Sequence, residues 1–443
     1  MSYSYASSYT PPGKVRWNVL VFPAGTENAL EIWRSLKDAK EVRLFSAAAA
    51  GVHHASYVYE ACAEIPDVRT DGWQQALNRL VRDKKIDFII PANDVVIKAL
   101  AAVRGELEAP VLMPANEVIA RVQSKRETLK LLADIVPVPR VFANAGEITA
   151  YPVFIKPDGG YGSQGAQLVR SAAELAEACA GVNDPLIQEY LSGEETSVDC
   201  FTDRHGKVRF AGARSRERIR MGTSMHSELL PEPEQAVFLT MAQGISDRMD
   251  LRGIWFFQMK KNGQGEWRLL EVDVRVAGTM ALNRVRGVNF PLLALFDAAG
   301  LDVEVETQRY EVVIDRSLLN RYRHNIHYST VYVDLDDTVV GNGRLNLDMV
   351  RFLFQCVNRN KKLVLLTKSL APDVNAYLER WRIRQVFDEV VVMPEEVAKA
   401  DHITDLDAIF IDDSFSARKD VRTRHGIPTF DPSMVEMLLD DRI

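Results

Sequence analysis

The sequence predicts a multidomain protein that combines α/β and α+β architecture. Apolar strand-like runs alternate with helix-like stretches near both ends of the chain, whereas the middle section has strands joined by glycine-rich turns. The length of 443 residues gives room for several domains of ordinary size. We expect a disordered N-terminus at 1–13, followed by domains at 14–115, 116–325 and 326–443.

The composition is typical of a folded protein and excludes some classes of partner. Hydrophobic residues make up 47% of the chain and charged residues 26%, close to globular averages. Because 54 Lys and Arg stand against 61 Asp and Glu, we expect no nucleic-acid partner. The four scattered cysteines indicate a reduced, cytoplasmic protein without a disulfide framework. We expect neither a signal peptide nor a membrane anchor, because the start is rich in Ser and Tyr and no run is apolar enough to span a bilayer.

The first predicted domain follows a strand, turn and helix pattern. An apolar run at 17–22 precedes a turn and a helix-like stretch at 28–36, and a second apolar run at 86–90 precedes another helix. Residues 111–114 add a short strand. Strands that alternate with helices predict a parallel α/β sheet over 14–115.

The middle domain begins with a different pattern. Residues 117–134 are helix-like, and a proline-rich break follows. Strand pairs are expected within 186–198 and within 254–274, the latter around the turn Asn262-Gly-Gln-Gly265. These pairs predict antiparallel sheets in an α+β domain.

A lysine and a glycine-rich loop suggest a phosphate site in this domain. Lys156 ends a strand, and the loop 159–165 that follows has four glycines in seven positions. Backbone N–H groups in such a loop can approach a polyphosphate closely, although a hairpin tip is the alternative. Lys125, at the start of a helical stretch, offers a second cation or simply belongs to a solvated helix face. Downstream, the strand 186–191 could meet a base edge, and a following carboxylate could bind ribose hydroxyls.

An acidic strand face suggests a metal site. Glu271, Asp273 and Arg275 are two residues apart on one strand, so they share a face. With an oxygen from Gln258 across the hairpin, they would suit Mg²⁺, while an exposed polar face is the alternative. The opposite face of the strand is expected to carry the apolar residues Leu270, Val272 and Val274.

These motifs, in this order, resemble the ATP-grasp superfamily, most closely its carbamoyl-phosphate-synthetase-like branch. The resemblance covers roughly 14–300 and implies a Rossmann-like domain ahead of the ATP-grasp domain. It implies ATP and Mg²⁺ as cofactors, with Mn²⁺ as an alternative metal. The nucleotide contacts that it implies are Lys125, Lys156, Gly160, Gly162 and Gly165 for the phosphates, Gln188, Glu189 and Leu191 for adenine, and Glu195 for ribose. The metal ligands that it implies are Gln258, Glu271 and Asp273.

This sequence departs from the family pattern at two of these positions. Asp273 stands where the family commonly has Asn, which keeps an oxygen ligand and adds charge. Gln188 stands where the adenine hinge often has Glu, which puts its hydrogen bond to the base in doubt.

The resemblance also implies a reaction. A carboxylate would attack the γ-phosphate, and an amine would capture the resulting acyl phosphate, with Arg275 holding the transferred phosphoryl group. The partners would be small-molecule carboxylate and amine substrates. The basic loop 214–220 could bind an anionic acceptor through Arg218, or be a solvated turn. The sequence leaves the oligomeric state open, a homo-oligomer included.

The last domain contains three strands that each end in a polar residue. The first ends in Asp334 and Asp336, the second in Thr367, and the third in Asp412 and Asp413. Paired carboxylates at a strand end can serve as nucleophile and proton donor around one Mg²⁺.

In order, these residues resemble the haloacid dehalogenase (HAD) superfamily of phosphatases over 326–443. The resemblance implies Asp334 as nucleophile, Asp336 as general acid/base, and Thr367 as phosphate ligand. It implies metal ligands among Asp334, Asp336, Asp412 and Asp413. Lys399 is preferred to Lys368 as the lysine of the pattern, and the stretch after Asp336 is too short for a large cap domain. A degenerate domain that only scaffolds is the alternative.

We therefore expect an enzyme, an ATP-grasp ligase fused to a HAD-like phosphatase domain. One alternative is a kinase or carbamoyl-phosphate-type enzyme that releases a phosphorylated product. Another is a nucleotide-binding regulatory protein without turnover, against which the Glu271 and Asp273 pair argues.

Overall fold

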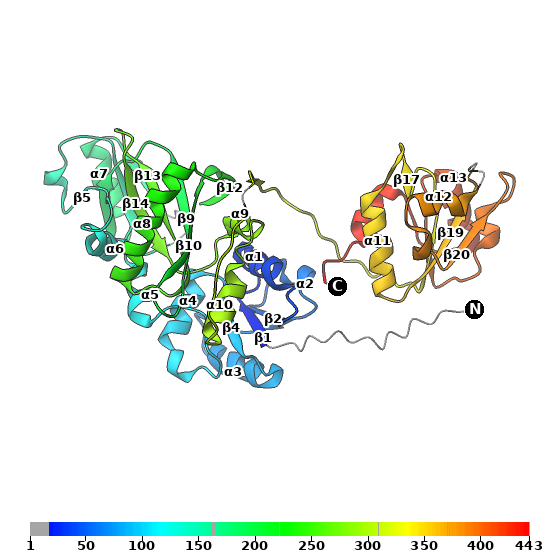
Figure 1. Cartoon of the computed structure of the whole chain (residues 1–443), viewed down its shortest axis with the longest axis horizontal. Helices are drawn as coiled ribbons and strands as arrows, with labels where there is room; N and C mark the ends of the chain where they lie inside the picture. The colour runs from blue at the N-terminus through cyan, green and yellow to red at the C-terminus, as the bar shows by residue number, and fades with distance from the viewer. Residues whose placement is uncertain are drawn as a thin grey trace. The chain divides into compact units, whose positions relative to one another are not determined.

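The computed structural model describes residues 17–160, 165–220, 222–308, 310–369, 371 and 373–442. The chain forms two compact units (Figure 1). The described part of the first unit contains residues 17–55 and 61–317, and that of the second contains residues 56–60 and 318–442. The expectations for 1–13 and for Gly162 lie outside the described residues.

The first unit opens with a parallel sheet of strand order β3-β2-β1-β4. Its strands are β1 (Trp17–Phe22), β2 (Val42–Ala48), β3 (Cys62–Glu64) and β4 (Phe88–Pro91). The accompanying helices are α1 (Glu27–Leu36), α3 (Trp73–Lys84) and α4 (Asp94–Ala102). The short helix α2 (Ala55–Val58) follows β2 in sequence, and its residues 56–58 are grouped with the second unit. The strand order reverses at β1, and the carboxyl ends at such a reversal are where open α/β sheets bind ligands. Helices α1 and α4 begin at this point, capped by the side chains of Thr26 and Asn93.

Two expected elements of this region differ from the structure. The strand expected at 111–114 is a single parallel bridge between Ile89 and Val111. The helix expected at 117–134 is two helices, α5 (Asn116–Gln123) and α6 (Lys125–Leu132). Ser124 separates them because its backbone is extended and its hydroxyl accepts a hydrogen bond from the Glu127 N–H at 3.1 Å, as an N-cap does.

An antiparallel sheet of strand order β5-β8-β6-β7 follows. Its strands are β5 (Val141–Phe142), β6 (Val153–Pro157), β7 (Gln167–Val169) and β8 (Pro185–Glu189). Helix α7 (Ala172–Ala180) packs Leu175 and Ala178 against this sheet. The pairing expected within 186–198 is wrong, because β8 belongs to this sheet and β9 to the next one, so the intervening loop crosses between sheets.

The next antiparallel sheet has strand order β10-β9-β13-β14. Its strands are β9 (Glu195–Thr202), β10 (Val208–Ser215), β13 (Gly253–Lys261) and β14 (Trp267–Asp273). The hairpin expected within 254–274 is confirmed as β13 and β14. Helix α8 (Glu232–Met249) places Phe238, Ala242 and Ile245 in one core with Trp255 and Phe257 of β13. This core packs one face of the sheet against α8. The other face of the sheet borders the cavity described below.

Smaller elements complete the first unit. A small sheet has strand order β11-β12-β15, and its strands are β11 (Glu217–Arg220), β12 (Thr223–Glu228) and β15 (Val313–Asp315). Two helices lie between them in sequence, α9 (Ala281–Arg284) and α10 (Phe290–Ala298). Short 3₁₀ turns of this unit are η1 (Arg104–Glu106), η2 (Ala145–Glu147) and η3 (Gly278–Met280).

The second unit is a parallel sheet of strand order β20-β19-β16-β21-β22. Its strands are β16 (Thr330–Val333), β19 (Lys362–Thr367), β20 (Glu389–Val392), β21 (Ala408–Ile411) and β22 (Thr429–Phe430). A small hairpin, β17 (Val340–Gly341) with β18 (Arg344–Leu345), follows β16. The helices are α11 (Leu347–Asn358), α12 (Val374–Arg380) and α13 (Phe415–His425), with turns η4 (Arg384–Val386), η5 (Lys399–His402) and η6 (Pro432–Leu438). Among the described residues, only the hairpin and α11 lie between β16 and β19, where a cap domain was not expected.

No helix in the described part of the chain combines the length and the apolar character that crossing a membrane requires.

Candidate functional site

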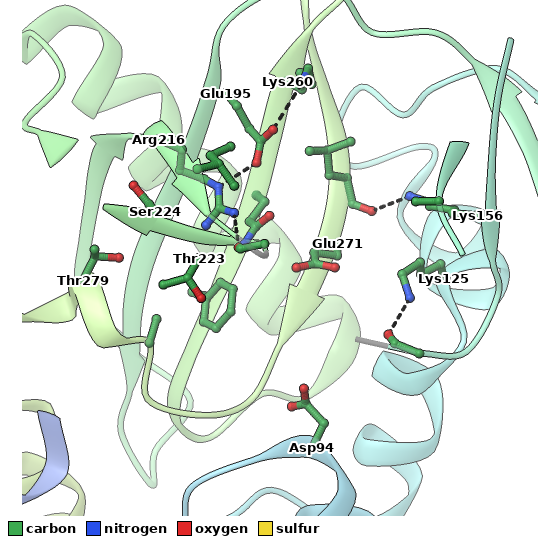
Figure 2. Close-up of a pocket in the computed structure, with 18 of the residues that line it drawn as sticks. Asp94, Lys125, Lys156, Glu195, Arg216, Thr223, Ser224, Lys260, Glu271 and Thr279 are labelled. Carbon is green, nitrogen blue, oxygen red and sulfur yellow. Dashed lines mark hydrogen bonds and ion pairs between the residues drawn. The ribbon is translucent and has the colours of Figure 1, made fainter. Parts of the chain in front are cut away.

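A cavity of about 480 Å³ lies between the sheets β5-β8-β6-β7 and β10-β9-β13-β14 of the first unit (Figure 2). Strands β6 and β8 supply Lys156 and Gln188 to its wall, and the other sheet supplies Glu195, Gln258 and Glu271. The N-terminal turns of α1 and α4 also border it. The fold therefore brings residues from distant parts of the sequence to one cavity, including most of those predicted to bind ATP.

Lys125 reaches the cavity because α6 begins there. The carboxylate of Asp158 holds this helix end, accepting from the Ser124 hydroxyl at 2.7 Å and from the Arg126 N–H at 2.6 Å. The Lys125 ammonium donates to the carbonyl oxygens of Gly160 at 2.9 Å and of Asp158 at 3.3 Å. Among the described residues it has no carboxylate partner within ion-pair distance, so its charge is available to a polyphosphate. Gly160 has a φ of +130°, which favours glycine at this point of the loop.

Lys156 is the second cation of the cavity and is buried. Its ammonium donates to the carbonyl oxygen of Leu270 at 3.2 Å. Burial lowers the pKa of Lys156 to about 8, an effect opposed by the charge of Glu271 and reinforced by that of Lys125. Figure 2 shows both lysines on the same side of Glu271. Two cations at one end of the cavity match the charge of a triphosphate.

The crossing from β8 to β9 lines another part of the cavity. Gln188 is buried, and its Oε1 has no hydrogen-bond partner in the described structure, which leaves an acceptor for a ligand N–H. Tyr190 and Leu191 also line the cavity. The side chain of Glu189 points elsewhere and accepts from the backbone N–H of Arg140 at 3.2 Å. Of the residues expected at adenine, Gln188 and Leu191 border the cavity, and the Glu189 carboxylate does not.

Glu195 begins β9 and lies between two cations. Its Oε1 accepts from Nε of Arg216 at 2.6 Å, and its Oε2 accepts from the Lys260 ammonium at 3.3 Å. Arg216 also donates to the carbonyl oxygen of Gly222 at 2.9 Å. These bonds fix the Glu195 carboxylate at the cavity wall, where it can accept from hydroxyl groups.

Gln258 and Glu271 face each other across β13 and β14. Both line the cavity, so this pair of oxygen donors lies where it was predicted. The expectation for Leu270 is wrong: Leu269 lies in the core instead, and Leu270 lines the cavity. The reason is a β-bulge, because Gln258 pairs with Glu271 whereas Met259 pairs with Leu269, and the extra residue reverses the alternation of faces.

Asp273 and Arg275 form a partly buried network with Asp94, the first residue of α4. Arg275 binds Oδ2 of Asp273 at 2.7 Å through Nη2 and Oδ1 of Asp94 at 2.8 Å through Nε, and its guanidinium lies over the ring of Phe256. Burial raises the pKa of Asp273 well above its usual range, and Asp94 and Glu271 add to that effect while Arg275 opposes it. Burial alone would lower the pKa of Arg275, but the carboxylates of Asp273 and Asp94 outweigh it and raise that pKa.

Asp273 and Gln258 line different cavities. Asp273 lines a neighbouring cavity of about 640 Å³, whereas Glu271 and Arg275 border both cavities. Of the expected metal ligands, Gln258 and Glu271 share the first cavity, and Asp273 is bound to Arg275 beside it.

Three functional candidates were missed from the sequence: Asp94, Arg216 and Lys260. Lys260 is two residues after Gln258 on one strand, so the alternation of faces could have found it. Asp94 follows β4 at the point where the strand order reverses, which could have found it too. In the basic loop the structure favours Arg216, because the exposed Arg218 pairs with Asp315 at 2.9 Å and is not among the residues that line the cavity.

A second constellation lies at the carboxyl ends of the strands in the second unit. Asp334 follows β16 and Asp412 follows β21, two adjacent parallel strands. The Lys399 ammonium donates to Oδ1 of Asp334 at 2.5 Å and to Oδ2 of Asp412 at 2.7 Å. Burial raises the pKa of Asp334 to about 7, with Lys399 opposing and Asp412 adding to the shift, and burial also raises the pKa of Asp412. Burial would lower the pKa of Lys399, but the two carboxylates raise it above its usual value.

Among the described residues, one group of acidic side chains has the geometry of a cation site: Asp334, Asp412 and Asp413, whose oxygens lie within 4.8 Å of one another. Asp336 is exposed and lies outside that group. It lines a cavity of about 450 Å³ that Asp334 and Asp413 also line. Of the two lysines considered, Lys399 lies between the carboxylates, and Lys368 donates to the carbonyl oxygen of Glu395 at 2.5 Å.

Thr367 ends β19 and is fully buried. Its hydroxyl accepts from the Ser369 N–H at 3.0 Å, and it is not among the residues that line the cavity. The structure does not place Thr367 at this cavity, and its role as a phosphate ligand stays a prediction.

Family models support an ATP-grasp domain in this chain. A family described as "ATP-grasp in the biosynthetic pathway with Ter operon" matches residues 182–317, and a family described as "ATP-grasp domain" matches residues 122–239. Both matched ranges lie within the first unit.

Curated relatives and solved structures agree with these matches. A 5-formaminoimidazole-4-carboxamide-1-(beta)-D-ribofuranosyl 5'-monophosphate synthetase of Pyrobaculum neutrophilum is 29% identical over 201 residues, 44% of this chain and 56% of the synthetase. A phosphoribosylamine–glycine ligase of Brucella melitensis is 24% identical over 274 residues, 54% of this chain and 64% of the ligase. The match thus spans little more than half the length of the synthetase. The biotin carboxylase of Campylobacter jejuni, solved as a β,γ-ATP complex, superposes with a TM-score of 0.56 at 15% identity over 66% of this chain and 73% of its own, which supports the fold.

The residues of the first cavity fit a nucleotide. An unpartnered amide oxygen, two lysines and an oxygen pair match a base N–H, a polyphosphate and a divalent cation, respectively.

Proposed function

We propose that the first unit is an ATP- and Mg²⁺-dependent ligase that joins a carboxylate to an amine. The observation that carries this proposal is the convergence of Lys125, Lys156 and Glu271 in one cavity of an ATP-grasp fold. The names of the synthetase and the glycine ligase, both of which denote synthetic enzymes, add support. We also propose that the chain is divided into domains at 14–115, 116–325 and 326–443.

The residues would divide the work along the cavity. Gln188 would accept from the adenine amino group, and Glu195 would accept from the ribose hydroxyls. Lys125 and Lys156 would offset charge on the phosphates, where charge-assisted hydrogen bonds are strongest. Gln258 and Glu271, with Asp273 after release from Arg275, would hold Mg²⁺, which supplies charge neutralisation to the transferring phosphoryl group.

The proposed reaction has two steps. A carboxylate oxygen of the substrate attacks the γ-phosphorus, the bond to ADP breaks, and an acyl phosphate forms. The amine nitrogen then attacks the acyl carbon, inorganic phosphate leaves and a proton is released. Arg275, which borders both cavities, would bind the transferred phosphoryl group in these steps.

ADP formation with MgATP tests this proposal. The chain carrying Asp334→Asn is challenged with pools of carboxylates and amines, with Glu271→Ala in the same background as the control. ADP that depends on Glu271 and on both a carboxylate and an amine supports a ligase. ADP with a stable phosphorylated product and no need for an amine supports a kinase instead, and nucleotide binding without ADP in any pool supports a regulatory protein.

We further propose that the second unit is a HAD-like phosphohydrolase. The supporting observation is the buried contact of Lys399 with both Asp334 and Asp412 at adjacent strand ends. Asp334 would attack the phosphorus of a phosphomonoester, Asp336 would protonate the leaving oxygen, and water would release phosphate from the aspartyl phosphate. Bound Mg²⁺ would neutralise charge among Asp334, Asp412 and Asp413.

Hydrolysis of p-nitrophenyl phosphate with Mg²⁺ tests the second activity. Loss of hydrolysis in Asp334→Asn, with retention in Glu271→Ala, supports a site in the second unit. Hydrolysis that survives Asp334→Asn, or that is absent from the unaltered chain with a panel of phosphomonoesters, contradicts it.

A further inference from the structure

The guanidinium of Arg316 packs against two residues of the nucleotide cavity wall, Gly278 and Ser224, next to the end of β15. The Arg316 N–H donates to the carbonyl oxygen of Met225 at 2.8 Å, which anchors the residue beside β12. A Cβ added to Gly278 would lie 2.9 Å from both terminal nitrogens of Arg316, so the guanidinium packs directly on this glycine. Gly278 and Ser224, whose carbonyl oxygen is 3.5 Å from Nη1 of Arg316, both line the cavity.

Arg316 lacks a carboxylate partner in the described structure. It is half-buried, and burial lowers its pKa, with Arg34 and Arg214 adding to that effect and Glu31 and Glu27 opposing it. Glu31 is already bound to Arg284 at 2.6 Å. A partly buried cation without an ion-pair partner is costly, and an anion at the cavity would offset that cost.

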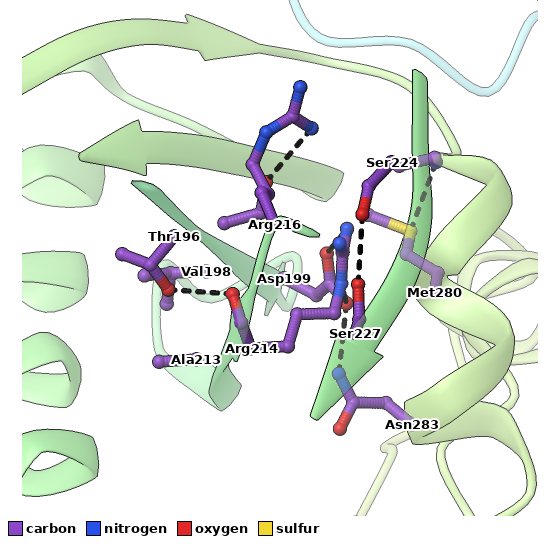
Figure 3. A network of polar contacts seen from close by, with 12 residues as sticks. Thr196, Val198, Asp199, Ala213, Arg214, Arg216, Ser224, Ser227, Met280 and Asn283 are labelled. Carbon is purple, nitrogen blue, oxygen red and sulfur yellow. Dashed lines mark hydrogen bonds and ion pairs between the residues drawn. The ribbon is translucent and has the colours of Figure 1, made fainter. Parts of the chain in front are cut away.

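A neighbouring arginine has an unused donor. Arg214 is fully buried on β10, and its Nε and Nη2 each bind Asp199 at 2.8 Å, in the network that Figure 3 draws with Ser224 and Ser227. Its Nη1 has no partner among the described residues. Asn283 donates to the same Asp199 carboxylate at 2.9 Å. Asp199 therefore accepts three hydrogen bonds, and none of them comes from Nη1 of Arg214.

This region lies away from the expected triphosphate contacts. Figure 2 shows Ser224 and Thr279 on the opposite side of Glu271 from Lys125 and Lys156. The N-terminal turn of α1 contacts η3 and borders the same cavity, where its backbone N–H groups carry a partial positive charge that the Glu27 carboxylate partly offsets.

We propose that Arg316, supported by the α1 N-terminus and the Arg214 side chain behind Ser224, forms a subsite for an anionic group of the second substrate. The group is a phosphate or a carboxylate distinct from the one that reacts. This inference rests on the proposed ligase function and assigns part of its substrate: a small molecule with an anionic group remote from the reacting atoms. Arg316 is thereby a specificity residue, and Arg218 is not.

Binding of simple sugars tests the subsite. The full chain with Asp334→Asn, saturated with a non-hydrolysable MgATP analogue that occupies Lys125 and Lys156, is titrated by calorimetry with ribose 5-phosphate, ribonate and ribose. We expect one or both anionic sugars to bind at least about tenfold more tightly than ribose, since charge-assisted hydrogen bonds are strong. The arm that binds identifies the group as phosphate or carboxylate.

Three variants in this background assign the binding to Arg316. Arg316→Gln should weaken the anionic sugar about tenfold, and Gly278→Ala should do the same without removing a charge, because its Cβ would displace the guanidinium. Arg248→Gln, a matched change at an exposed pair with Asp134, should leave binding unchanged. The proposal is overturned if Arg316→Gln and Gly278→Ala both leave the affinity unaltered, or if the unaltered chain binds all three sugars equally.

Nucleotide affinity measured in the same titrations keeps the two proposals apart. A chain that does not bind the MgATP analogue contradicts the proposed function itself. A chain that binds it normally but does not prefer an anionic sugar contradicts the subsite alone. If Arg316→Gln does not fold, as judged by circular dichroism, the result with Gly278→Ala decides.

Discussion

The ammonium of Lys399 lies 2.5 Å from Oδ1 of Asp334, at the carboxyl end of the central strand of the second unit. Both side chains are at least nine-tenths buried. The same ammonium binds Asp412, so one cation holds two carboxylates that would otherwise repel each other. The contact is therefore both a structural pair and the centre of the proposed phosphohydrolase site.

Lys399→Met should destabilise the second unit and abolish hydrolysis of p-nitrophenyl phosphate. Removing one partner of a buried ion pair costs about 3 kcal/mol, because the remaining charges stay buried without compensation. We expect calorimetry of the full chain to show one unfolding transition at a lower temperature. Adding Asp334→Asn should restore part of that loss.

The matched control is Lys362→Met on the same sheet. Lys362 pairs with Glu389 at 3.3 Å, but both side chains are more than half exposed, so we expect almost no change in the transition. Equal transitions in Lys399→Met and the unaltered chain would contradict the buried pair.

Asp94→Asn should slow the ligase reaction more than it weakens nucleotide binding. Asp94 binds Nε of Arg275 at 2.8 Å and connects α4 to the exit of β14. Without its charge, Arg275 is held by Asp273 alone and is less well oriented toward the phosphoryl group. We expect kcat for Glu271-dependent ADP formation to fall about tenfold, as small misplacements of a positioned group do.

A matched change in the same part of the chain separates this effect from a loss of stability. Glu108→Gln removes a charge from a partly exposed pair with Arg82 and should leave kcat unchanged. A rise in KM for ATP with constant kcat in Asp94→Asn would count against a positioning role.

Much of the fold could be predicted from local patterns. The apolar run at 17–22, the helix-like stretch at 28–36 and the apolar run at 86–90 correspond to β1, α1 and β4. These elements are continuous apolar runs or strongly periodic segments, for which pattern and structure agree. The break between α5 and α6 was missed because a single N-cap side chain, Ser124, interrupts an otherwise helical pattern.

The site could be predicted from the sequence only where side chains alternate regularly between the two faces of a strand. Gln258 and Glu271 meet as expected, but the bulge beside Met259 turns Leu270 into the cavity, and a bulge has no sequence signal here. The side chain of Glu189 is directed to Arg140 because it alternates with Gln188. Asp94 is distant in sequence from Arg275, and the tertiary fold brings it beside that residue at the cavity wall.

Gln188→Leu should weaken ATP binding without reducing stability. The buried Oε1 of Gln188 has no partner in the described structure, so its removal relieves an unsatisfied acceptor. In the complex this oxygen would accept from the 6-amino group of adenine, whereas guanine has a carbonyl oxygen at that position and would place two acceptors against each other. We expect the preference for ATP over GTP to fall about tenfold. Calorimetric titration with both nucleotides measures it, and an unchanged preference would place the base elsewhere.

Nucleotide affinity should fall as the pH rises above about 8, and Lys156 should cause the fall. Burial lowers its pKa to about 8 in the nucleotide-free protein, so above that pH the ammonium that a triphosphate needs must first regain a proton. Between this value and the ordinary 10.5, the unfolded chain binds more protons at Lys156 than the folded chain, so the titration of this group makes folding more favourable as pH rises. The expected loss of affinity is therefore not a loss of stability caused by Lys156. Lys156→Arg keeps its charge throughout, and its affinity, measured by titration with MgADP from about pH 7 to 9.5, should lack the break near 8. A break of equal size in both proteins would assign the titration to another group.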